Sequence, residues 1–305
     1  MAEYRLLTYA EGGKPRAGVL VAGRVYPAAD LLKGAGVDAS SVLAILGSWP
    51  RAHAALARAA AKVKPAQGKP MARVKLLAPI LYPAGLFCAG ANYWDHMEEM
   101  AKASGRTVDR SKRPDEPWFF VKTSAHSVTG PDVKVKLPKN SLQVDWEAEL
   151  GVVIGKPGRD LSVDRAMSVV AGYTIVNDLS ARDLMTRKDR PPVMTYDWVG
   201  QKCFDDAAPM GPWITPAAYL KDCSHLSVKL WVNGVLKQDS NTSQLIHNVP
   251  EQISWLSRHV TLRPGDVIAT GTPAGVGMPR GEFLKRGDVV KIEIEGCGTL
   301  ANTMA

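Results

Sequence analysis

Hydrophobic and acidic side chains alternate along residues 144–150, and this alternation is typical of a β-strand. Successive side chains of a strand point to opposite faces, so the apolar residues would share one face and the acidic residues the other. The apolar face would consist of Val144, Trp146, Ala148 and Leu150. The acidic face would consist of Asp145, Glu147 and Glu149. We therefore predict a strand with one buried face and three carboxylates on the other, about 7 Å apart per two-residue step.

The N-terminal residues show two further patterns. Short alternating runs on either side of a double-glycine turn predict an antiparallel meander over residues 3–27. Residues 39–64 are rich in Ala and Leu at helical spacing, interrupted at Pro50, and predict helix. Residues 66–83 contain prolines and turn residues and are typical of a linker. A small N-terminal α/β domain is therefore predicted over residues 1–75.

Short β-like runs outnumber helical runs in the remaining residues, 76–305. Strands are predicted at 117–122, 132–137, 145–154, 169–177, 226–232, 266–270 and 288–295. Helices are predicted at 92–103, 180–188 and 249–259. The pair Asn233-Gly234 predicts a tight turn. Many strands with few helices favour an α+β, mostly β fold with a closed or sandwiched core.

The composition excludes several classes of protein. Of the 305 residues, 46% are hydrophobic and 22% are charged, which is ordinary for a soluble globular protein. No run of 18 apolar residues predicts a transmembrane helix, and no signal-peptide pattern is present. The four cysteines are scattered, which argues against a zinc ribbon or a disulfide framework. We expect a cytoplasmic protein that does not contact a membrane.

The net charge of +8 is concentrated in residues 102–139, which contain nine lysines and arginines. A solvated surface is the simplest interpretation. Nucleic-acid binding is an alternative, but acidic residues interrupt the stretch and no nucleic-acid-binding motif accompanies it. A third interpretation is a positive field that attracts small anionic substrates to a cleft. We therefore expect a small anionic ligand and no nucleic acid.

The acidic strand is a candidate metal site. Like charges this close repel one another unless a positive charge lies among them, and carboxylate oxygens are ligands that suit Mg²⁺. The alternative is that the carboxylates are simply solvated on an exposed strand face. A second acidic element is Asn177-Asp178, which ends an apolar run just before a predicted helix. Asp178 is either the N-cap of that helix or a further metal ligand.

His96 and Glu99 form a second candidate site for chemistry. On the helix predicted at 92–103 they would lie on one face, at positions i and i+3. A carboxylate beside an imidazole raises its basicity and suits a general base that activates water. The alternative is a routine contact on a surface helix. A Gly- and Pro-rich loop at 271–277 would let the backbone approach a ligand closely, but it lacks the lysine of a P-loop.

Seven motifs follow one another in a fixed order. They are H-x-x-E at 96–99, E-x-E at 147–149, N-D-x-S-A-R-D at 177–183, K-x-F-D at 202–205, G-P-W at 211–213, V-N-G at 232–234 and P-G-D-x-I-x-T-G-T-P-x-G-V-G at 264–277. Over roughly residues 80–305 this arrangement resembles the fumarylacetoacetate hydrolase superfamily. The resemblance implies a mixed β-sandwich roll over the catalytic domain, 76–305, and usually a homodimer. Some members carry a small N-terminal domain.

The resemblance also implies a metal site. Glu147, Glu149 and Asp178 match the carboxylates that hold a single Mg²⁺ or Mn²⁺. Lys202 matches a lysine near the metal that stabilises negative charge. Asp145 matches no ligand, and is either beside the site or solvated.

The catalytic and substrate-binding groups are implied in the same way. His96 and Glu99 match a catalytic dyad on a lid segment, about 92–115, that orders over bound substrate. Thr272 matches a loop that contacts the carboxylate of the substrate. Two further substrate-binding candidates lie in matching stretches, namely Tyr93 and Lys122.

Two positions depart from the pattern of the family. Hydrolytic members often carry a glutamine seven residues after the aspartate ligand, where it helps to bind an oxyanion. Here that residue is Met185, and Gln201, beside Lys202, is a possible substitute. The family often has proline after the lysine at 122, and here it is Thr123. The first departure weakens the case for hydrolysis relative to isomerisation or decarboxylation.

The activity implied is metal-dependent hydrolysis of a C–C bond in a 2,4-diketo acid of the acylpyruvate or fumarylpyruvate type, in aromatic or small-acid catabolism. In this interpretation the His96–Glu99 pair activates water. The alternative is an isomerase or decarboxylase of a 2-hydroxydienoate or oxaloacetate-type acid, similar to 5-carboxymethyl-2-hydroxymuconate isomerase. A basic anion- or nucleic-acid-binding protein is the non-enzymatic alternative.

Overall fold

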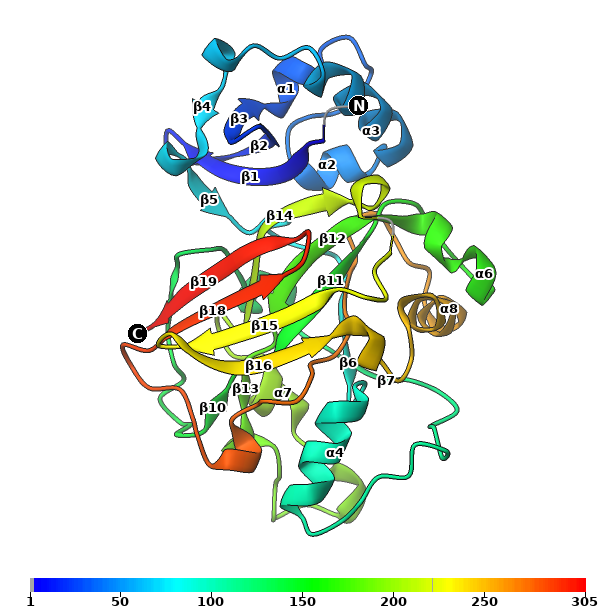
Figure 1. The fold of residues 1–305 in the computed structure, drawn as a ribbon, viewed down its shortest axis with the longest axis vertical. Coiled ribbons are helices and arrows are strands. Elements are labelled where there is room, and N and C mark those ends of the chain that lie inside the picture. The colour runs from blue at the N-terminus through cyan, green and yellow to red at the C-terminus, as the bar shows by residue number, and fades with distance from the viewer. Residues whose placement is uncertain (1–2, 221) are drawn as a thin grey trace.

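The computed structural model describes residues 3–220 and 222–305, and the N-terminal residues form one end of it (Figure 1). This end contains β1 (Arg5–Glu11), β2 (Lys14–Val21), β3 (Arg24–Pro27), α1 (Ala28–Leu31), α2 (Val42–Leu46), α3 (Trp49–Ala60), β4 (Lys69–Pro70) and β5 (Lys75–Leu77). The predicted meander over 3–27 is confirmed by the pairing of β1 with β2 and of β2 with β3. The helix predicted at 39–64 is two helices, and Pro50 lies in the first turn of α3, where its missing N–H is tolerated.

The rest of the chain is mostly β. Its strands are β6 (Leu86–Gly90), β7 (Trp118–Val121), β8 (Val128–Thr129), β9 (Lys134–Val135), β10 (Val144–Asp145), β11 (Ala148–Ile154), β12 (Val170–Asn177), β13 (Ser180–Ala181), β14 (Ala208–Pro216), β15 (Ser227–Val232), β16 (Val235–Asn241), β17 (Val267–Ala269), β18 (Val289–Ile294) and β19 (Gly298–Met304). Its helices are α4 (Trp94–Ala103), α5 (Ser124–Ser127), α6 (Val163–Ala166), α7 (Trp198–Lys202) and α8 (Val249–His259). The predicted α+β, mostly β class is confirmed.

Two large sheets form the body of the molecule (Figure 1). One has the order β4-β3-β2-β1-β14-β12-β11-β17-β6-β7, and the other has the order β16-β15-β18-β19-β9. The N-terminal meander joins the first sheet where β1 pairs with β14, with Leu6 opposite Ile214. The domain boundary near residue 75 stays a prediction.

The two faces of the first sheet are buried in different ways. Leu150, Val152 and Ile154 of β11 point into the core between the two sheets. Val153 points to the opposite face, into a second core formed with the N-terminal helices. Glu149 has the parity of Val153, so it lies on the face opposite the core between the sheets. The predicted alternation of apolar and acidic side chains is therefore confirmed.

Several elements differ from the prediction. The helix predicted at 180–188 is wrong: β13 pairs with β10, and only a 3₁₀ turn follows at Arg182–Leu184. The strand predicted at 145–154 is interrupted between β10 and β11. Strands β14, β16 and β19 were not predicted, because β14 contains glycine and prolines and the other two are rich in small or polar residues.

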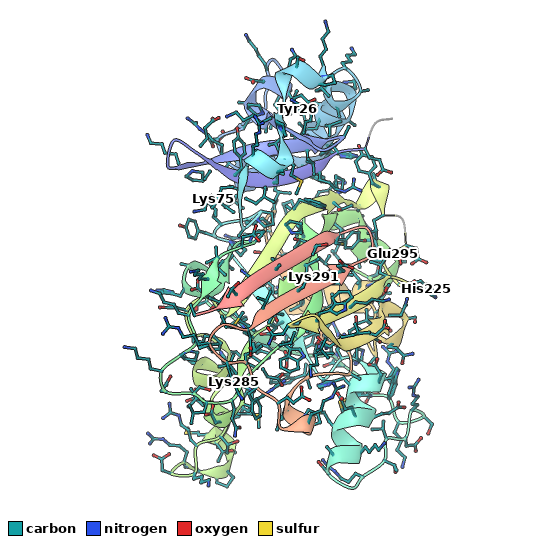
Figure 2. The ribbon with its side chains drawn as sticks, turned by 60° about the vertical axis from the view of Figure 1, so that its left-hand side comes forward. Tyr26, Lys75, His225, Lys285, Lys291 and Glu295 are labelled. Carbon is teal, nitrogen blue, oxygen red and sulfur yellow. The ribbon has the colours of Figure 1, made fainter. Side chains whose placement is uncertain are left out.

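The second sheet carries ion pairs between Lys229 and Asp239 and between Lys291 and Glu293, and Lys291 is labelled in Figure 2. Lys291 of β18 also lies 4.4 Å from the centre of the Trp231 ring. None of the helices described in residues 3–220 and 222–305 is long and apolar enough to span a bilayer. The four cysteines are free thiols.

Candidate metal centre and active site

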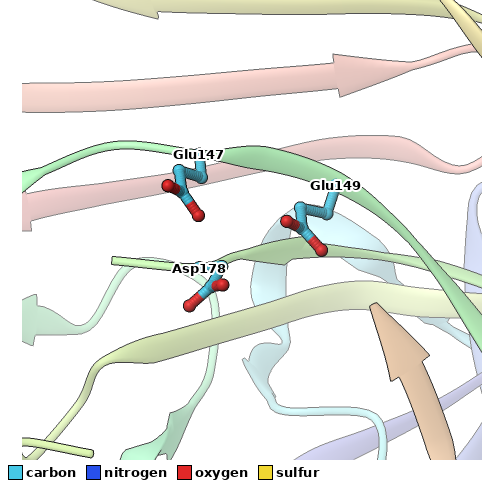
Figure 3. Close-up of side chains that lie close together, drawn as sticks. All are labelled: Glu147, Glu149 and Asp178. Atoms are coloured by element: carbon cyan, nitrogen blue, oxygen red, sulfur yellow. The ribbon is translucent and has the colours of Figure 1, made fainter. Parts of the chain in front are cut away.

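Strand pairing brings three acidic side chains together. Glu147 lies in the interruption between β10 and β11, and Glu149 lies in β11. Because β11 pairs with β12, the backbone N–H of Asp178 donates to the carbonyl of Glu147 over 2.9 Å. One carboxylate oxygen from each of Glu147, Glu149 and Asp178 lies within 4.8 Å of the others, and the side chains converge (Figure 3). The structure thus assembles the three residues that the resemblance selects as metal ligands.

These carboxylates are removed from water. The exposed fractions are 5% for Glu147, 1% for Glu149 and 1% for Asp178. A solvated acidic face, the alternative left open by the sequence, is therefore wrong. An N-cap role for Asp178 is also wrong, because strand β13 follows it. A buried charge is costly unless it is paired. The partners of each carboxylate therefore show how much positive charge the cluster still lacks.

Three cationic side chains surround the cluster. Lys202 Nζ donates to Glu147 Oε2 and to Asp178 Oδ2, over 2.8 Å in each case. Lys122 pairs with Asp178, and Arg182 donates to Glu147 Oε1 over 2.5 Å. Burial alone would raise the pKa of Glu147, but Lys202 and Arg182 outweigh it and hold that pKa below its ordinary value. Glu147 is therefore ionised.

Glu149 is neutralised less well than its two neighbours. Its carboxylate accepts a hydrogen bond from the backbone N–H of Gly271 over 3.0 Å, and no cationic side chain of the described residues pairs with it. Burial raises the pKa of Glu149 well above its ordinary value, and the charges of Asp178 and Glu147 raise it further. A divalent cation among these oxygens would relieve that repulsion. An all-oxygen set of three buried carboxylates fits Mg²⁺ or Mn²⁺.

Asp145 is not a solvated bystander, although that was one of the two possibilities. It is fully buried, accepts from Arg182 Nε over 3.0 Å, and accepts from the backbone N–H groups of Gly277 and Met278 over 2.6 and 3.0 Å. It lies outside the three-carboxylate group. Asp145 therefore ties Arg182 and the glycine-rich loop to the segment that carries Glu147 and Glu149.

The glycines of the 271–277 loop pack against the protein itself. A Cβ atom on Gly275 would lie 2.0 Å from the carbonyl oxygen of Lys237, and one on Gly277 would lie 1.9 Å from that of Glu282. The sequence predicted that the backbone of this loop lies close to a ligand. At Gly275 and Gly277 it instead lies close to the backbone of neighbouring segments. The loop therefore cannot tolerate side chains at either glycine.

Gly277→Ala is expected to destabilise the protein by about 1–3 kcal/mol, because its methyl group collides with a backbone oxygen that cannot easily move. The measurement is the melting temperature of the purified variant. The control is Gly281→Ala, four residues beyond this loop, where the added Cβ meets nothing within 4 Å and only the positive φ of +65° opposes it. Equal losses at the two positions would contradict the packing argument.

A cavity of about 140 Å³ opens onto the acidic cluster. Such a volume is small compared with pockets for drug-sized ligands, so it suits a small molecule. Its apolar lining includes Trp118, Phe120 and Met185. Its polar lining includes His96, Glu147, Glu149, Arg182, Gln201, Lys202 and Thr272. The cavity thus combines a cationic wall with acidic ligands and one imidazole.

The predicted dyad is not joined by a hydrogen bond. His96 lines the cavity, and its buried Nδ1 has no hydrogen-bonding partner among the described residues. Glu99 instead accepts from the backbone N–H of Gly275 over 2.8 Å and from Arg280 over 3.3 Å. Burial lowers the pKa of His96, and the nearby charge of Glu147 only partly offsets this. His96 is therefore a neutral imidazole at pH 7, able to accept a proton.

The substrate-binding candidates lie at different depths. Thr272 lines the cavity, but its hydroxyl donates to the carbonyl of Ala148 over 3.1 Å and accepts from Gln238 over 2.9 Å. Lys122 is buried against Asp178 and the carbonyl of Leu179, away from the cavity lining. Tyr93 is fully buried, and its hydroxyl has no partner among the described residues. Of the three, only Thr272 reaches the cavity.

Sequence reasoning gave no role to two residues that organise the site. Arg182 bridges Asp145 and Glu147, and it stands in the S-A-R-D motif quoted above. A buried acidic cluster requires positive counter-charges, and this requirement could have identified Arg182 from the sequence. Gln238 is fully buried, accepts from the N–H of Ala148 over 2.9 Å, and donates to Thr272 and Pro273. No pattern in the sequence singles out Gln238.

Comparison with known proteins agrees with this geometry. Residues 85–305 match the family model described as fumarylacetoacetate hydrolase, C-terminal. A mitochondrial oxaloacetate tautomerase of Xenopus laevis is 41% identical over 231 residues, 75% of this chain and 68% of that protein.

Solved structures resemble the chain over nearly its whole length. A fumarylacetoacetate hydrolase of Exiguobacterium antarcticum has a TM-score of 0.78 and 32% identity, and covers 99% of each chain. A maleylpyruvate hydrolase of Sphingobium sp. SYK-6, solved with manganese(II) and pyruvate, has a TM-score of 0.76 and 28% identity, over 99% of this chain and 98% of that one.

Proposed function

Because the chain belongs to the fumarylacetoacetate hydrolase family, we propose that it is a metal-dependent enzyme that interconverts the keto and enol forms of a small 2-oxo dicarboxylic acid of the oxaloacetate type. The observation that carries the proposal is the position of the His96 imidazole, which lines the cavity of the acidic cluster without a hydrogen bond to Glu99. Tautomerisation requires one base and stabilisation of an enolate, whereas hydrolysis also requires activated water.

Glu147, Glu149 and Asp178 would hold Mg²⁺ or Mn²⁺ in this proposal. When bound, the cation supplies Lewis-acid polarisation of the carbonyl group of the substrate. The donor set fits such an ion because all three side chains are carboxylates and Glu149 pairs with no cationic side chain in the described part of the chain.

The residues of the chain would perform the proton transfer. His96 would take a proton from the carbon beside the carbonyl group, the electron pair of that C–H bond would form a C=C bond, and the π pair of the carbonyl group would move onto its oxygen. A proton from water at that oxygen would complete the enol, and His96 would return its own proton to solvent. Lys202 and Arg182 would offset part of the negative charge of the carboxylates, and together with the divalent cation they would attract a dianionic acid. Their ion pairs with Glu147 hold both cations in place before substrate binds.

The proposal predicts metal-dependent exchange of the C3 protons of oxaloacetate with deuterium, at a rate far above the rate without enzyme. Proton NMR in D₂O measures this exchange directly, with Mn²⁺ or Mg²⁺ added and with EDTA as the control. Exchange that is no faster than in buffer alone, in protein shown to bind Mn²⁺, would contradict the proposed reaction on this substrate.

Hydrolysis of a C–C bond is a second candidate, favoured by the likeness to maleylpyruvate hydrolase over 99% of this chain. Mass analysis separates the candidates when acylpyruvates, fumarylpyruvate and oxaloacetate are supplied. Hydrolysis adds one water and yields two acids, decarboxylation releases CO₂, and tautomerisation leaves the mass unchanged. The lid at 92–115, the homodimer, the role in aromatic catabolism and the cytoplasmic location stay predictions; the Xenopus relative is described as mitochondrial.

A further inference from the structure

Gln201 is a buried amide in the wall of the cavity. It lies in the last turn of α7, directly before Lys202, and only 1% of its surface is exposed. It lines the same cavity as His96 and Glu149. A polar side chain this deep requires partners, so its hydrogen bonds indicate what it is placed to do.

One end of this amide is already occupied. The hydroxyl of Tyr196 donates to Gln201 Oε1 over 2.8 Å. No hydrogen bond joins Gln201 Nε2 to another group in the described ranges, 3–220 and 222–305, and Nε2 is not one of the fully buried, unpaired atoms. Since a tyrosine hydroxyl donates to the carbonyl end, the amide N–H groups are left to face the cavity.

Tyr196 is itself held in position by the segment that precedes α7. Residues 186 and 196 form an isolated β-bridge, closed by hydrogen bonds from Arg187 N to Thr195 O over 2.7 Å and from Asp197 N to Met185 O over 2.9 Å. The Tyr196 ring also meets the Trp118 ring edge to face, with 5.9 Å between the centroids. The hydroxyl is therefore presented to Gln201 by a braced loop.

Three other donors of the cavity, Lys202, Arg182 and Thr272, already donate to protein groups. Lys202 donates to Glu147 and Asp178, and Arg182 donates to Asp145 and Glu147. The hydroxyl of Thr272 donates to the carbonyl of Ala148. Gln201 Nε2 is thus a neutral side-chain donor on a cavity-lining residue, and no acceptor among the described residues uses it.

We propose that Gln201 Nε2–H donates a hydrogen bond to the substrate oxygen on which negative charge develops, and that Tyr196 is a positioning residue that orients this amide. The proposal rests on the keto–enol function proposed above. As the C–H proton passes to His96, the electron pair of that bond forms the C=C bond of the enolate, and the π pair of the carbonyl group moves onto its oxygen. Gln201 stabilises the charge on that oxygen without giving up its own proton. A preoriented donor of this kind favours the enolate over the ground-state ketone.

The test measures kcat and KM for proton exchange in single and double variants of the full chain. Gln201→Met, which keeps the length of the side chain and removes the donor, is expected to lower kcat by about 10²–10³ with KM little changed. Tyr196→Phe is expected to lower kcat less. The double variant is expected to be no slower than Gln201→Met, because Tyr196 acts through Gln201. The matched control is Tyr219→Phe, whose hydroxyl lies outside the cavity and has no described partner, and which is expected to keep wild-type kcat.

The outcomes separate this inference from the function on which it rests. An inactive wild-type protein overturns the proposed function, whereas an active wild type with an equally active Gln201→Met variant overturns only the role of Gln201. Losses that add fully in the double variant overturn the positioning role of Tyr196. Mn²⁺ binding and melting temperature verify that each variant is folded. If Gln201→Met does not fold, the shorter amide of Gln201→Asn replaces it, with a loss of kcat again expected and full activity contradicting the inference.

Discussion

Glu149→Gln is expected to weaken Mn²⁺ binding by at least about 100-fold and to abolish metal-dependent turnover. Removing even an outer partner of a metal ligand costs 10–100-fold in affinity, and Glu149 is proposed to be a ligand itself. Glutamine keeps the shape of the side chain and can still accept from the N–H of Gly271, so the loss would come from the missing charge. Titration calorimetry with Mn²⁺ measures the affinity.

The same substitution is expected to stabilise the metal-free protein. A carboxyl group whose folded-state pKa lies above its unfolded value favours folding at low pH, and this contribution is lost as the pH rises from the unfolded toward the folded pKa. The pKa of Glu149 is raised by burial and by Asp178 and Glu147, so metal-free wild type should lose stability with rising pH in that range. The Glu149→Gln variant should lose less stability over the same pH range. Melting temperatures measured in EDTA across this range would show the difference.

The control for both measurements is Glu295→Gln, which removes an exposed carboxylate in the turn between β18 and β19 (Figure 2). It should leave Mn²⁺ affinity and turnover at wild-type values. Wild-type Mn²⁺ affinity in Glu149→Gln would contradict the metal site, whatever its activity.

His96→Asn is expected to lower kcat by about 10²–10⁴ while Mn²⁺ affinity stays near the wild-type value. His96 lines the cavity, and it is not one of the three clustered carboxylates. Because burial lowers the pKa of His96, its basic form persists below the ordinary histidine value of about 6.5. The wild-type rate should therefore fall on the acid side only at a pH below that value. A variant with full activity would exclude His96 as the base.

Glu99→Gln is the informative companion variant. Glu99 contacts Gly275 N–H and Arg280 rather than His96, so we expect this variant to keep most of the activity of the wild type. A loss as large as that of His96→Asn would instead indicate that the two residues act as one unit during turnover. That result would favour the water-activating dyad and hydrolysis.

Local pattern was sufficient for the fold class and for most elements. Alternation along residues 144–150 correctly divided the strand into a core face and an acidic face, because the period of a strand is independent of its surroundings. Pattern failed at β14, whose glycine and prolines weaken any strand signal although it lies between β1 and β12. It also failed at 180–188, where pairing with β10 decides the conformation.

For the candidate site too, the sequence predicted some features correctly and missed others. The motifs selected Glu147, Glu149 and Asp178, and the structure brings their oxygen atoms within 4.8 Å of one another. The same motifs paired His96 with Glu99, yet in the structure Glu99 accepts a hydrogen bond from the N–H of Gly275. Spacing along a helix defines which side chains share a face, but a backbone donor from a distant loop can compete for the same carboxylate.

The sequence by itself determined which residues are the candidates for the chemistry, since carboxylates, imidazole and lysine are recognisable by type and order. Only the tertiary structure decided their partners. It buried the carboxylates and supplied Arg182, Lys122 and Lys202 as counter-charges, while no cationic side chain of residues 3–220 and 222–305 pairs with Glu149. The physical reason is that charge neutralisation and burial depend on contacts between strands far apart in the sequence, which no local pattern encodes.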